Sequence, residues 1–153
     1  MITRRRTLLT AAAWAAGGLA QAAPGATGLD LAPYRGRVLY LDFWASWCGP
    51  CKLSFPYMQS MVSRFPPGDF AVLTVNLDRE RAKADLFEKQ VQNRLPVVHD
   101  PKGEIAKAYA VKEMPSSVLI GRDGKVRYVH KGFFPAKAKE YEAHISELIS
   151  EKS

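Results

Sequence analysis

Two cysteines, Cys48 and Cys51, are the residues of this 153-residue chain best suited to covalent chemistry. The chain has two cysteines in total, and they lie three positions apart in WASWCGPCK, residues 44–52. A disulfide between them closes a very short loop, so it restrains the unfolded chain little and makes a poor structural staple. The spacing favours a pair of thiols that is oxidised and reduced in use.

A structural zinc site is the other interpretation of a close cysteine pair, and it needs about four ligands. Histidines would have to complete such a site, but His99, His130 and His144 are isolated from one another along the sequence. We interpret them as solvated or capping residues, and we expect no metal site.

The residues around the cysteines support the redox interpretation. Gly49 and Pro50 follow Cys48, and proline is favoured in the first turn of a helix. Free backbone N–H groups at a helix N-terminus stabilise a thiolate and lower the pKa of the thiol, which makes Cys48 a nucleophile near neutral pH. We expect Cys51 to be more buried and to act as the resolving thiol. Trp47 would offer a flat apolar surface to a substrate polypeptide.

Asp42 is the polar exception in VLYLDFW, an apolar run over residues 38–44 that predicts a central strand buried on both faces. A buried carboxylate costs free energy unless it takes up a proton, so burial would raise the pKa of Asp42. The alternative is an aspartate at a strand edge that faces water.

The chain after this strand alternates helix and strand patterns. A helix is expected over residues 50–65, with a kink at Pro56. Its apolar stripe repeats every four residues: Leu53, Tyr57, Met61 and Phe65. A second buried strand over residues 70–78 completes a strand-helix-strand unit, which predicts a right-handed parallel crossover.

The second half of the chain predicts four more elements. A polar helix over residues 79–94 has an apolar side made of Leu86, Phe87 and Val91. LPVVHD and GEIAKAYAV predict a short strand and a helix, and SSVLIGRDGKVRYVHKG predicts a hairpin that turns at Asp123-Gly124. A C-terminal helix follows, with one apolar face: Tyr141, Ile145, Leu148 and Ile149.

The first 22 residues have the pattern of a signal peptide: a basic start, an Ala-rich apolar stretch and then small residues. The three arginines at positions 4–6 resemble a twin-arginine signal and also suit the general secretory route. The apolar stretch is short for a membrane span, so we expect cleavage, with an uncleaved anchor as the alternative. Removing these arginines lowers the net charge from +7 to +4, and acids interleave with the remaining lysines, so no nucleic-acid surface is predicted.

Several motifs together resemble thioredoxin: DFWASWCGPCK, the proline at position 56, VNLD, MPSSVLI and the RDGKV hairpin. The resemblance covers about residues 29–150. The extra segment LPVVHDPKGEIAKAYAV is similar to the strand-helix insertion of exported TlpA/ResA-type thiol:disulfide oxidoreductases. The resemblance implies an α/β, thioredoxin-like three-layer fold over residues 23–153, with a central mixed sheet flanked by helices.

The resemblance also implies roles for individual residues. The Met114-Pro115 bond would be cis and would face the cysteine pair, so that both residues contact substrate together with Trp47 and the Gly49-Pro50 turn. Asp42, six positions before Cys48, would accept the proton of Cys51.

Two positions depart from the expected patterns. Thr74 stands where thioredoxin has a lysine that pairs with the aspartate. Ser54 stands where TlpA/ResA-type proteins have a glutamate, and these proteins have asparagine at the position of Asp42. Both departures leave the proton transfer and the substrate preference open.

The predicted function is an exported, periplasmic reductase of protein disulfides that acts through a mixed disulfide and needs no cofactor beyond its own cysteine pair. A Gly-Pro pair between the cysteines resembles thioredoxin, near −270 mV, more than the oxidant DsbA, near −120 mV. The resemblance implies a monomer, a membrane electron donor of the DsbD/CcdA type, and substrates such as the haem-site cysteines of apocytochrome c. Two alternatives stay open: a disulfide-donating oxidase, and a peptide-binding assembly module without turnover.

Overall fold

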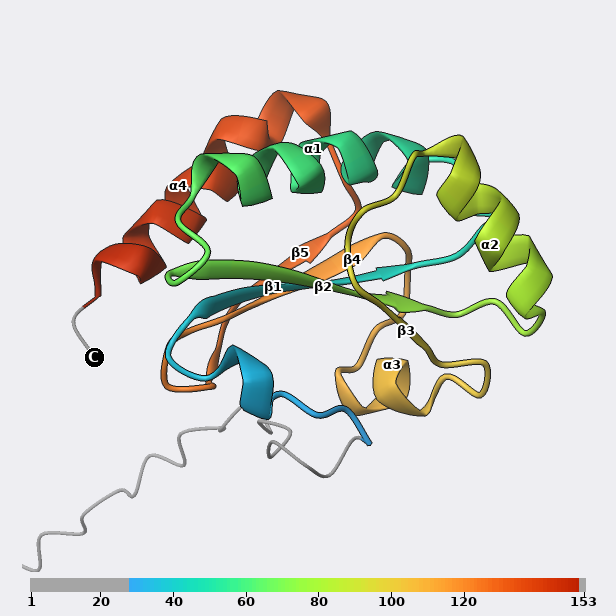
Figure 1. Ribbon diagram of the computed structural model, residues 1–153, viewed down its shortest axis with the longest axis horizontal. Coiled ribbons are helices and arrows are strands. Elements are labelled where there is room, and N and C mark those ends of the chain that lie inside the picture. The colour runs from blue at the N-terminus through green and yellow to red at the C-terminus, as the bar shows by residue number, and fades with distance from the viewer. Residues whose placement is uncertain (1–27, 152–153) are drawn as a thin grey trace, which may run out of the picture.

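The computed structural model describes residues 28–151 as a five-stranded mixed sheet with helices on both faces (Figure 1). The strands are β1 (Val38–Trp44), β2 (Phe70–Asn76), β3 (Val97–His99), β4 (Ser116–Ile120) and β5 (Val126–Lys131), in the spatial order β3-β2-β1-β4-β5. The helices are α1 (Cys51–Arg64), α2 (Arg81–Gln90), α3 (Glu104–Ala108) and α4 (Ala138–Ser150). The predicted signal peptide, residues 1–22, lies outside the described residues.

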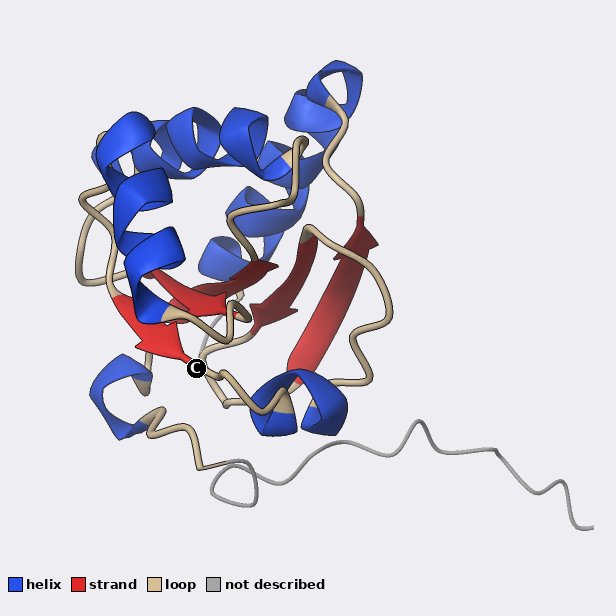
Figure 2. Cartoon of the chain, turned by 90° about the vertical axis from the view of Figure 1, so that its right-hand side faces the viewer, coloured by secondary structure: helices blue, strands red, loops and turns tan. Residues whose placement is uncertain are grey.

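The helices form two layers with the sheet between them (Figure 2). Buried side chains of α1, α2 and α4 share one apolar cluster with one face of the sheet. The opposite face packs against α3 and against residues near η1 (Ala32–Tyr34), a short 3-10 helix. The predicted three-layer, thioredoxin-like fold is therefore confirmed.

β1 lies at the centre of the sheet, and all seven of its residues are buried. It pairs in parallel with β2 and antiparallel with β4. Because successive side chains of a strand point to opposite faces, Tyr40 and Trp44 enter the cluster under α1, whereas Leu41 and Phe43 enter the other. The C-terminal end of β1 thus meets the N-terminal end of β4 at one edge of the sheet.

The predicted apolar stripe of α1 is wrong in part. Leu53 is 56% exposed, and the buried residues of the helix are Cys51, Ser54, Phe55, Met58 and Met61. A four-residue step overshoots one helical turn, so three such steps rotate about 120° around the helix axis. A strict four-residue repeat therefore cannot stay on one face, and the helix buries a mixture of three- and four-residue spacings instead.

The second helix and strand are also shorter than predicted. α2 buries Ala84 and Phe87 but leaves Leu86 60% exposed. The helix stops at Gln90, and Gln92 has a positive φ of 49°, which interrupts helical geometry. β2 stops at Asn76, two residues earlier than predicted.

The predicted insertion is present as β3 and α3, which precede the Met114-Pro115 bond. β3 extends the sheet beside β2 in parallel register, and α3 contributes Ile105 and Ala106 to the second apolar cluster. The predicted β4-β5 hairpin and the C-terminal helix are confirmed. Within residues 28–151, no helix is long and apolar enough to cross a membrane.

Candidate active site

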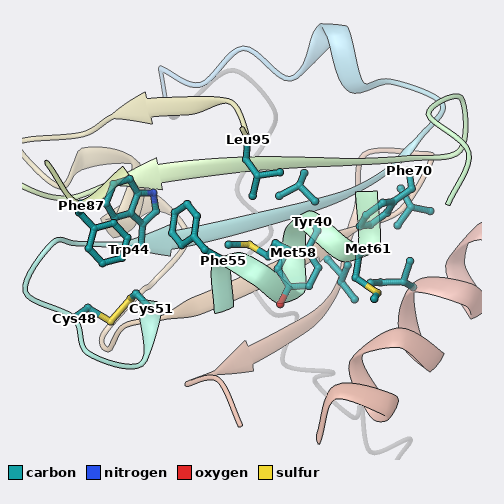
Figure 3. Packing of buried hydrophobic residues seen from close by; sticks show 14 of the residues in the cluster. Tyr40, Trp44, Cys48, Cys51, Phe55, Met58, Met61, Phe70, Phe87 and Leu95 are labelled. Atoms are coloured by element: carbon teal, nitrogen blue, oxygen red, sulfur yellow. A yellow bond between two sulfur atoms is a disulfide. The ribbon is translucent and has the colours of Figure 1, made fainter. Parts of the chain in front are cut away.

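The cysteine pair lies where β1 passes into α1. Cys48 and Cys51 form a disulfide, with Cys48 4% exposed and Cys51 fully buried in the same cluster as Trp44 and Phe55 (Figure 3). Pro50 is the N-cap of α1 rather than a residue of its first turn. Cys51 therefore begins a 14-residue helix and Cys48 lies two residues before its N-cap, at the positive end of the helix dipole, which favours a thiolate.

The loop before Cys48 is held by a carboxylate that lies two residues after the neighbouring strand β2. Asp78 is buried, and it accepts hydrogen bonds from the backbone N–H of Ser46 at 2.8 Å and from the Ser46 hydroxyl at 2.7 Å. The Asn76 side-chain amide donates to the same carboxylate at 2.7 Å. This network fixes the backbone two residues before Cys48.

The sequence analysis did not identify Asp78 as part of the site. A usable signal was present, because the aspartate of VNLD is the last residue of the predicted second strand, which pairs in parallel with β1. Carboxyl ends of parallel strands meet at one edge of a sheet, so residues after β1 and β2 were bound to be neighbours.

Asp42 is fully buried inside β1, on the face that α1 covers. The Ser117 hydroxyl donates to its Oδ1 at 2.8 Å, and Oδ2 has no hydrogen-bond partner among the described residues. Burial raises the pKa of Asp42 to about 7, and the hydrogen bond from Ser117 partly opposes this shift. The interpretation of Asp42 as a solvent-facing aspartate at a strand edge is therefore excluded.

The side chains at the two positions that depart from the related patterns form their hydrogen bonds elsewhere. Thr74 is the register partner of Asp42 on β2, but its hydroxyl donates to the Pro96 carbonyl instead. The Ser54 hydroxyl donates to the Cys51 carbonyl at 3.0 Å. Neither Thr74 nor Ser54 supplies a charge or a hydrogen bond to Asp42. The donor to the Asp42 carboxylate among residues 28–151 is therefore Ser117.

The Met114-Pro115 bond is cis, as predicted, and it immediately precedes β4. Met114 packs against the apolar cluster that contains both cysteines. Pro115 is buried, and its carbonyl accepts the backbone N–H of Gly132 at 2.8 Å. Trp47, the residue before Cys48, is 70% exposed.

Gly49 and Pro50 are exposed between the cysteines. The fold thus gathers the predicted site residues at one edge of the sheet, where β1 ends and β4 begins. A family model described as Redoxin matches residues 10–145 of the chain. The chain belongs to the Redoxin family.

Curated relatives of this Redoxin chain are named for thiol-disulfide chemistry. One is the thiol-disulfide oxidoreductase ResA of Bacillus thuringiensis, 34% identical over 104 residues, which cover 68% of this chain and 60% of that protein. The chain thus spans about three fifths of the length of the relatives of this name.

Solved structures agree with the Redoxin assignment. A Chlorobium tepidum protein, solved under the name thiol:disulfide interchange protein DsbE, has a TM-score of 0.77 and 45% identity, covering 83% of this chain and 91% of that one. StoA from Bacillus subtilis has a TM-score of 0.62 and 31% identity, covering 72% and 84%.

The surroundings of His130 and His144 in this Redoxin chain differ from the prediction that the histidines are solvated or capping residues. His130 is buried, and its Nε2 lies 3.0 Å from Nδ1 of His144, whose ring stacks on Tyr128. The two histidines are 14 residues apart in sequence, and packing of α4 on β5 brings them together. Within residues 28–151, no group of three His, Cys, Asp or Glu side chains could hold a metal ion.

Proposed function

We propose that this Redoxin chain is a thiol:disulfide oxidoreductase that reduces protein disulfides. The observation that carries the proposal is the Cys48–Cys51 disulfide at the N-terminus of α1, the helix that follows β1, and β1 carries the buried acid Asp42. The names of the relatives support the same chemistry. The cysteine pair itself carries the electrons, so the reaction needs no other cofactor.

In the first step, the Cys48 thiolate attacks one sulfur of a substrate disulfide. A Cys48–substrate bond forms, the substrate disulfide breaks, and the leaving sulfur departs as a thiolate that takes a proton from water. The helix N-terminus favours this step because its N–H groups stabilise the attacking thiolate.

In the second step, Cys51 attacks the Cys48 sulfur of the mixed disulfide. The Cys51 thiol must first lose a proton, and we propose that the Asp42 carboxylate takes it. A carboxyl group with a pKa of about 7 can accept and release a proton near neutral pH. The second substrate thiolate leaves, the Cys48–Cys51 disulfide forms, and two electrons have passed to the substrate.

Insulin reduction in the presence of dithiothreitol tests the activity. The mature protein should accelerate it, Cys48→Ser should abolish the acceleration, and Cys51→Ser should accumulate a mixed disulfide. A peptide-binding module without turnover would give no acceleration in any variant.

The direction of electron flow is tested by the reduction potential of the Cys48–Cys51 pair in glutathione or dithiothreitol buffers. A value near −270 mV is expected for a reductase, whereas a value near −120 mV would make the protein a disulfide donor and overturn the proposed direction.

The role of Asp42 is tested by Asp42→Asn, with Asp85→Asn on the exposed face of α2 as the control. We expect resolution of the mixed disulfide to slow at least about tenfold near pH 7 in the first variant and to stay unchanged in the second. An unchanged rate in Asp42→Asn would remove this residue from the mechanism.

We also propose that the protein is exported to the periplasm as a monomer and receives electrons from a membrane dithiol carrier of the DsbD/CcdA type. The arginines and apolar stretch within residues 1–22 support export, with the twin-arginine route and an uncleaved anchor as open variants. Cell fractionation of the full chain and of a variant with the three arginines replaced by lysine tests this: export lost in the variant supports the twin-arginine route.

A further inference from the structure

A row of polar side chains crosses the sheet on the face that α1 and α4 cover. Thr74 on β2, Asp42 on β1, Ser117 on β4 and His130 on β5 are successive register partners. Register partners on neighbouring strands point to the same face of a sheet. The residues on either side of Asp42 on this face belong to an apolar cluster. The polar row therefore leads from the buried acid through an apolar layer to β5, the edge strand.

The inner part of the polar row is joined by a hydrogen bond. The Ser117 hydroxyl donates to Oδ1 of Asp42 at 2.8 Å, and both residues are buried. Tyr40 adjoins the next step along the row, because its hydroxyl interacts with Ser117 and its ring centroid lies 6.5 Å from that of His130. Ser117 is therefore the first residue on the way from Asp42 to the edge of the sheet.

His130 and His144 form the outer part of this path. His130 is 9% exposed, and its Nε2 lies 3.0 Å from Nδ1 of His144 on α4. His144 is half-buried, and its ring stacks on Tyr128 with 3.9 Å between the centroids and 7° between the planes. The stacking fixes the ring of His144. The histidine pair therefore connects a buried position on β5 with the surface of the molecule.

The second ring nitrogen of His130 is the point where the two parts meet. This atom, Nδ1, is buried and has no hydrogen-bond partner in the described part of the chain. The Cβ atoms of register partners such as Ser117 and His130 lie about 4.5–5.5 Å apart. One water molecule can bridge polar groups at such a separation, and buried polar atoms without a protein partner commonly bind one. An internal water between Ser117 and Nδ1 of His130 would join the two parts.

The surroundings of His130 keep its ring neutral near pH 7. Burial lowers the pKa of His130 to about 4, His144 and Lys137 lower it further, and Glu140 opposes them. A neutral imidazole has one nitrogen that accepts a proton and one that donates a proton. It can therefore take up a proton on one side of the ring as it releases another on the opposite side.

We propose that Ser117, His130 and His144 form a proton route that connects Asp42 with the solvent. The inference rests on the proposed role of Asp42 as the acceptor of the Cys51 proton, and it adds how that acid loses its proton again. A substrate in the mixed disulfide covers the cysteine side of the site. The proton route ends on α4 instead, so it stays open while the substrate is attached.

Each group on the proton route takes one proton and gives one. Asp42 passes its proton to the Ser117 hydroxyl, whose own proton moves to the bridging water, and the water protonates Nδ1 of His130. Nε2 of His130 then gives its proton to Nδ1 of His144, and Nε2 of His144 releases one to the solvent. One proton has left the protein, Asp42 is a carboxylate again, and both histidines are neutral.

The exchange rate of the Asp42 proton tests the route. Near pH 7 the protonated and charged forms of Asp42 are both populated, so ¹³C NMR relaxation dispersion of its carboxyl carbon reports their interconversion. The oxidised protein is used without substrate, so the measurement does not depend on reductase activity. Each variant is measured at its own titration midpoint, so that a shifted pKa is not mistaken for slower exchange.

Glutamine variants remove the proton carriers and keep groups that can form hydrogen bonds. His130→Gln and His144→Gln should each slow the exchange about tenfold or more, because an amide does not take up and release protons near neutral pH. His144 is half-buried, so its variant tests the route even where His130→Gln does not fold. The matched control is His99→Gln, which changes a half-buried histidine on the opposite edge strand β3 and should leave the rate unchanged.

Imidazole in solution separates a missing proton carrier from disturbed packing. In His144→Ala, added imidazole should restore most of the exchange rate, because it supplies the same chemistry from the solvent. Sodium chloride at the same concentration should not restore it. Imidazole should change little in the natural protein and in His99→Gln, where the route is intact.

The outcomes distinguish this inference from the function on which it rests. If the exchange slows in the variants and imidazole restores it, but the natural protein does not reduce insulin, the proposed function fails and the route stands. If insulin is reduced but His144→Gln exchanges as fast as the natural protein, the proposed function stands and the route is wrong. Slow exchange that imidazole does not restore would also overturn the route, because altered packing would then explain it.

Discussion

Two aspartates are buried within or just after the paired strands β1 and β2, and their surroundings differ. Asp78, after β2, accepts three hydrogen bonds, two of them from Ser46 in the loop before Cys48. Asp42, inside β1, accepts one, from Ser117, and its second oxygen has no partner among residues 28–151. The same chemical group is thus nearly saturated with donors at one site and nearly without them at the other.

The comparison shows that burial of a carboxylate does not by itself indicate proton chemistry. Donors replace the water that a carboxylate loses on burial, so three donors make Asp78 a fixed acceptor that holds the loop. With one donor, the charged form of Asp42 is disfavoured and its pKa rises to about 7. The number of donors therefore separates the positioning residue from the candidate proton acceptor.

The largest expected effect is that of Asp42→Asn on stability at alkaline pH. Because folding raises the pKa of Asp42 from 3.8 to about 7, the folded state binds more protons than the unfolded state between these values. The contribution of this pKa shift to the free energy of unfolding is fully present below about pH 4 and is lost as pH rises through about 7. This contribution is about 4 kcal/mol at most. Asparagine cannot ionise, so the variant should be more stable than the natural protein at pH 8 and similar to it at pH 4.

Urea denaturation of the two oxidised proteins from pH 4 to pH 9 measures this difference. The natural protein should lose stability across the upper part of the range relative to the variant. A stability difference that stays constant with pH would show that Asp42 does not titrate in this way.

Asp78→Ala should have an effect of opposite sign and of about 3 kcal/mol. The substitution leaves the Ser46 N–H and the Asn76 amide without their acceptor in a buried place, and each unsatisfied donor costs about 1–3 kcal/mol. The loop before Cys48 should loosen at the same time, so insulin reduction should fall as well.

The control for Asp78→Ala is Asp85→Ala, which removes an exposed aspartate that pairs with Arg81 on α2. Exposed ion pairs of this kind contribute about 0–1 kcal/mol. Equal losses of stability in the two variants would contradict the anchoring role of Asp78.

The sequence predicted those parts of the site that depend on one stretch of chain. The cysteine spacing, the apolar run around Asp42 and the strand after Pro115 are local patterns, and the structure has all three as expected. The cis bond was expected from the resemblance to thioredoxin rather than from any local pattern.

Features that depend on two distant stretches were missed. The Asp78–Ser46 hydrogen bonds join the ends of two strands 32 residues apart, and the His130–His144 contact requires α4 to pack on β5. The exposure of Leu53 and Leu86 also depends on tertiary packing, because the rotation of each helix decides which apolar residues are buried.

The smallest expected effect, and the most direct test of the donor argument, is that of Ser117→Ala. The hydrogen bond from Ser117 lowers the pKa of Asp42, so its removal should raise that pKa above 7. We expect a loss of stability of about 1 kcal/mol that is larger at pH 8 than at pH 5, because the bond to the charged carboxylate is the stronger one.

Ser116→Ala is the matched control, since the Ser116 hydroxyl donates to the Glu113 carbonyl and not to a titrating group. Carboxyl NMR titration of Asp42 should shift to higher pH in Ser117→Ala and stay in place in Ser116→Ala. If both variants leave the titration unchanged, burial alone sets the acidity of Asp42, and the difference between the two aspartates does not depend on their donors. If the shift appears, one serine on β4 decides how close to neutrality the buried acid can work.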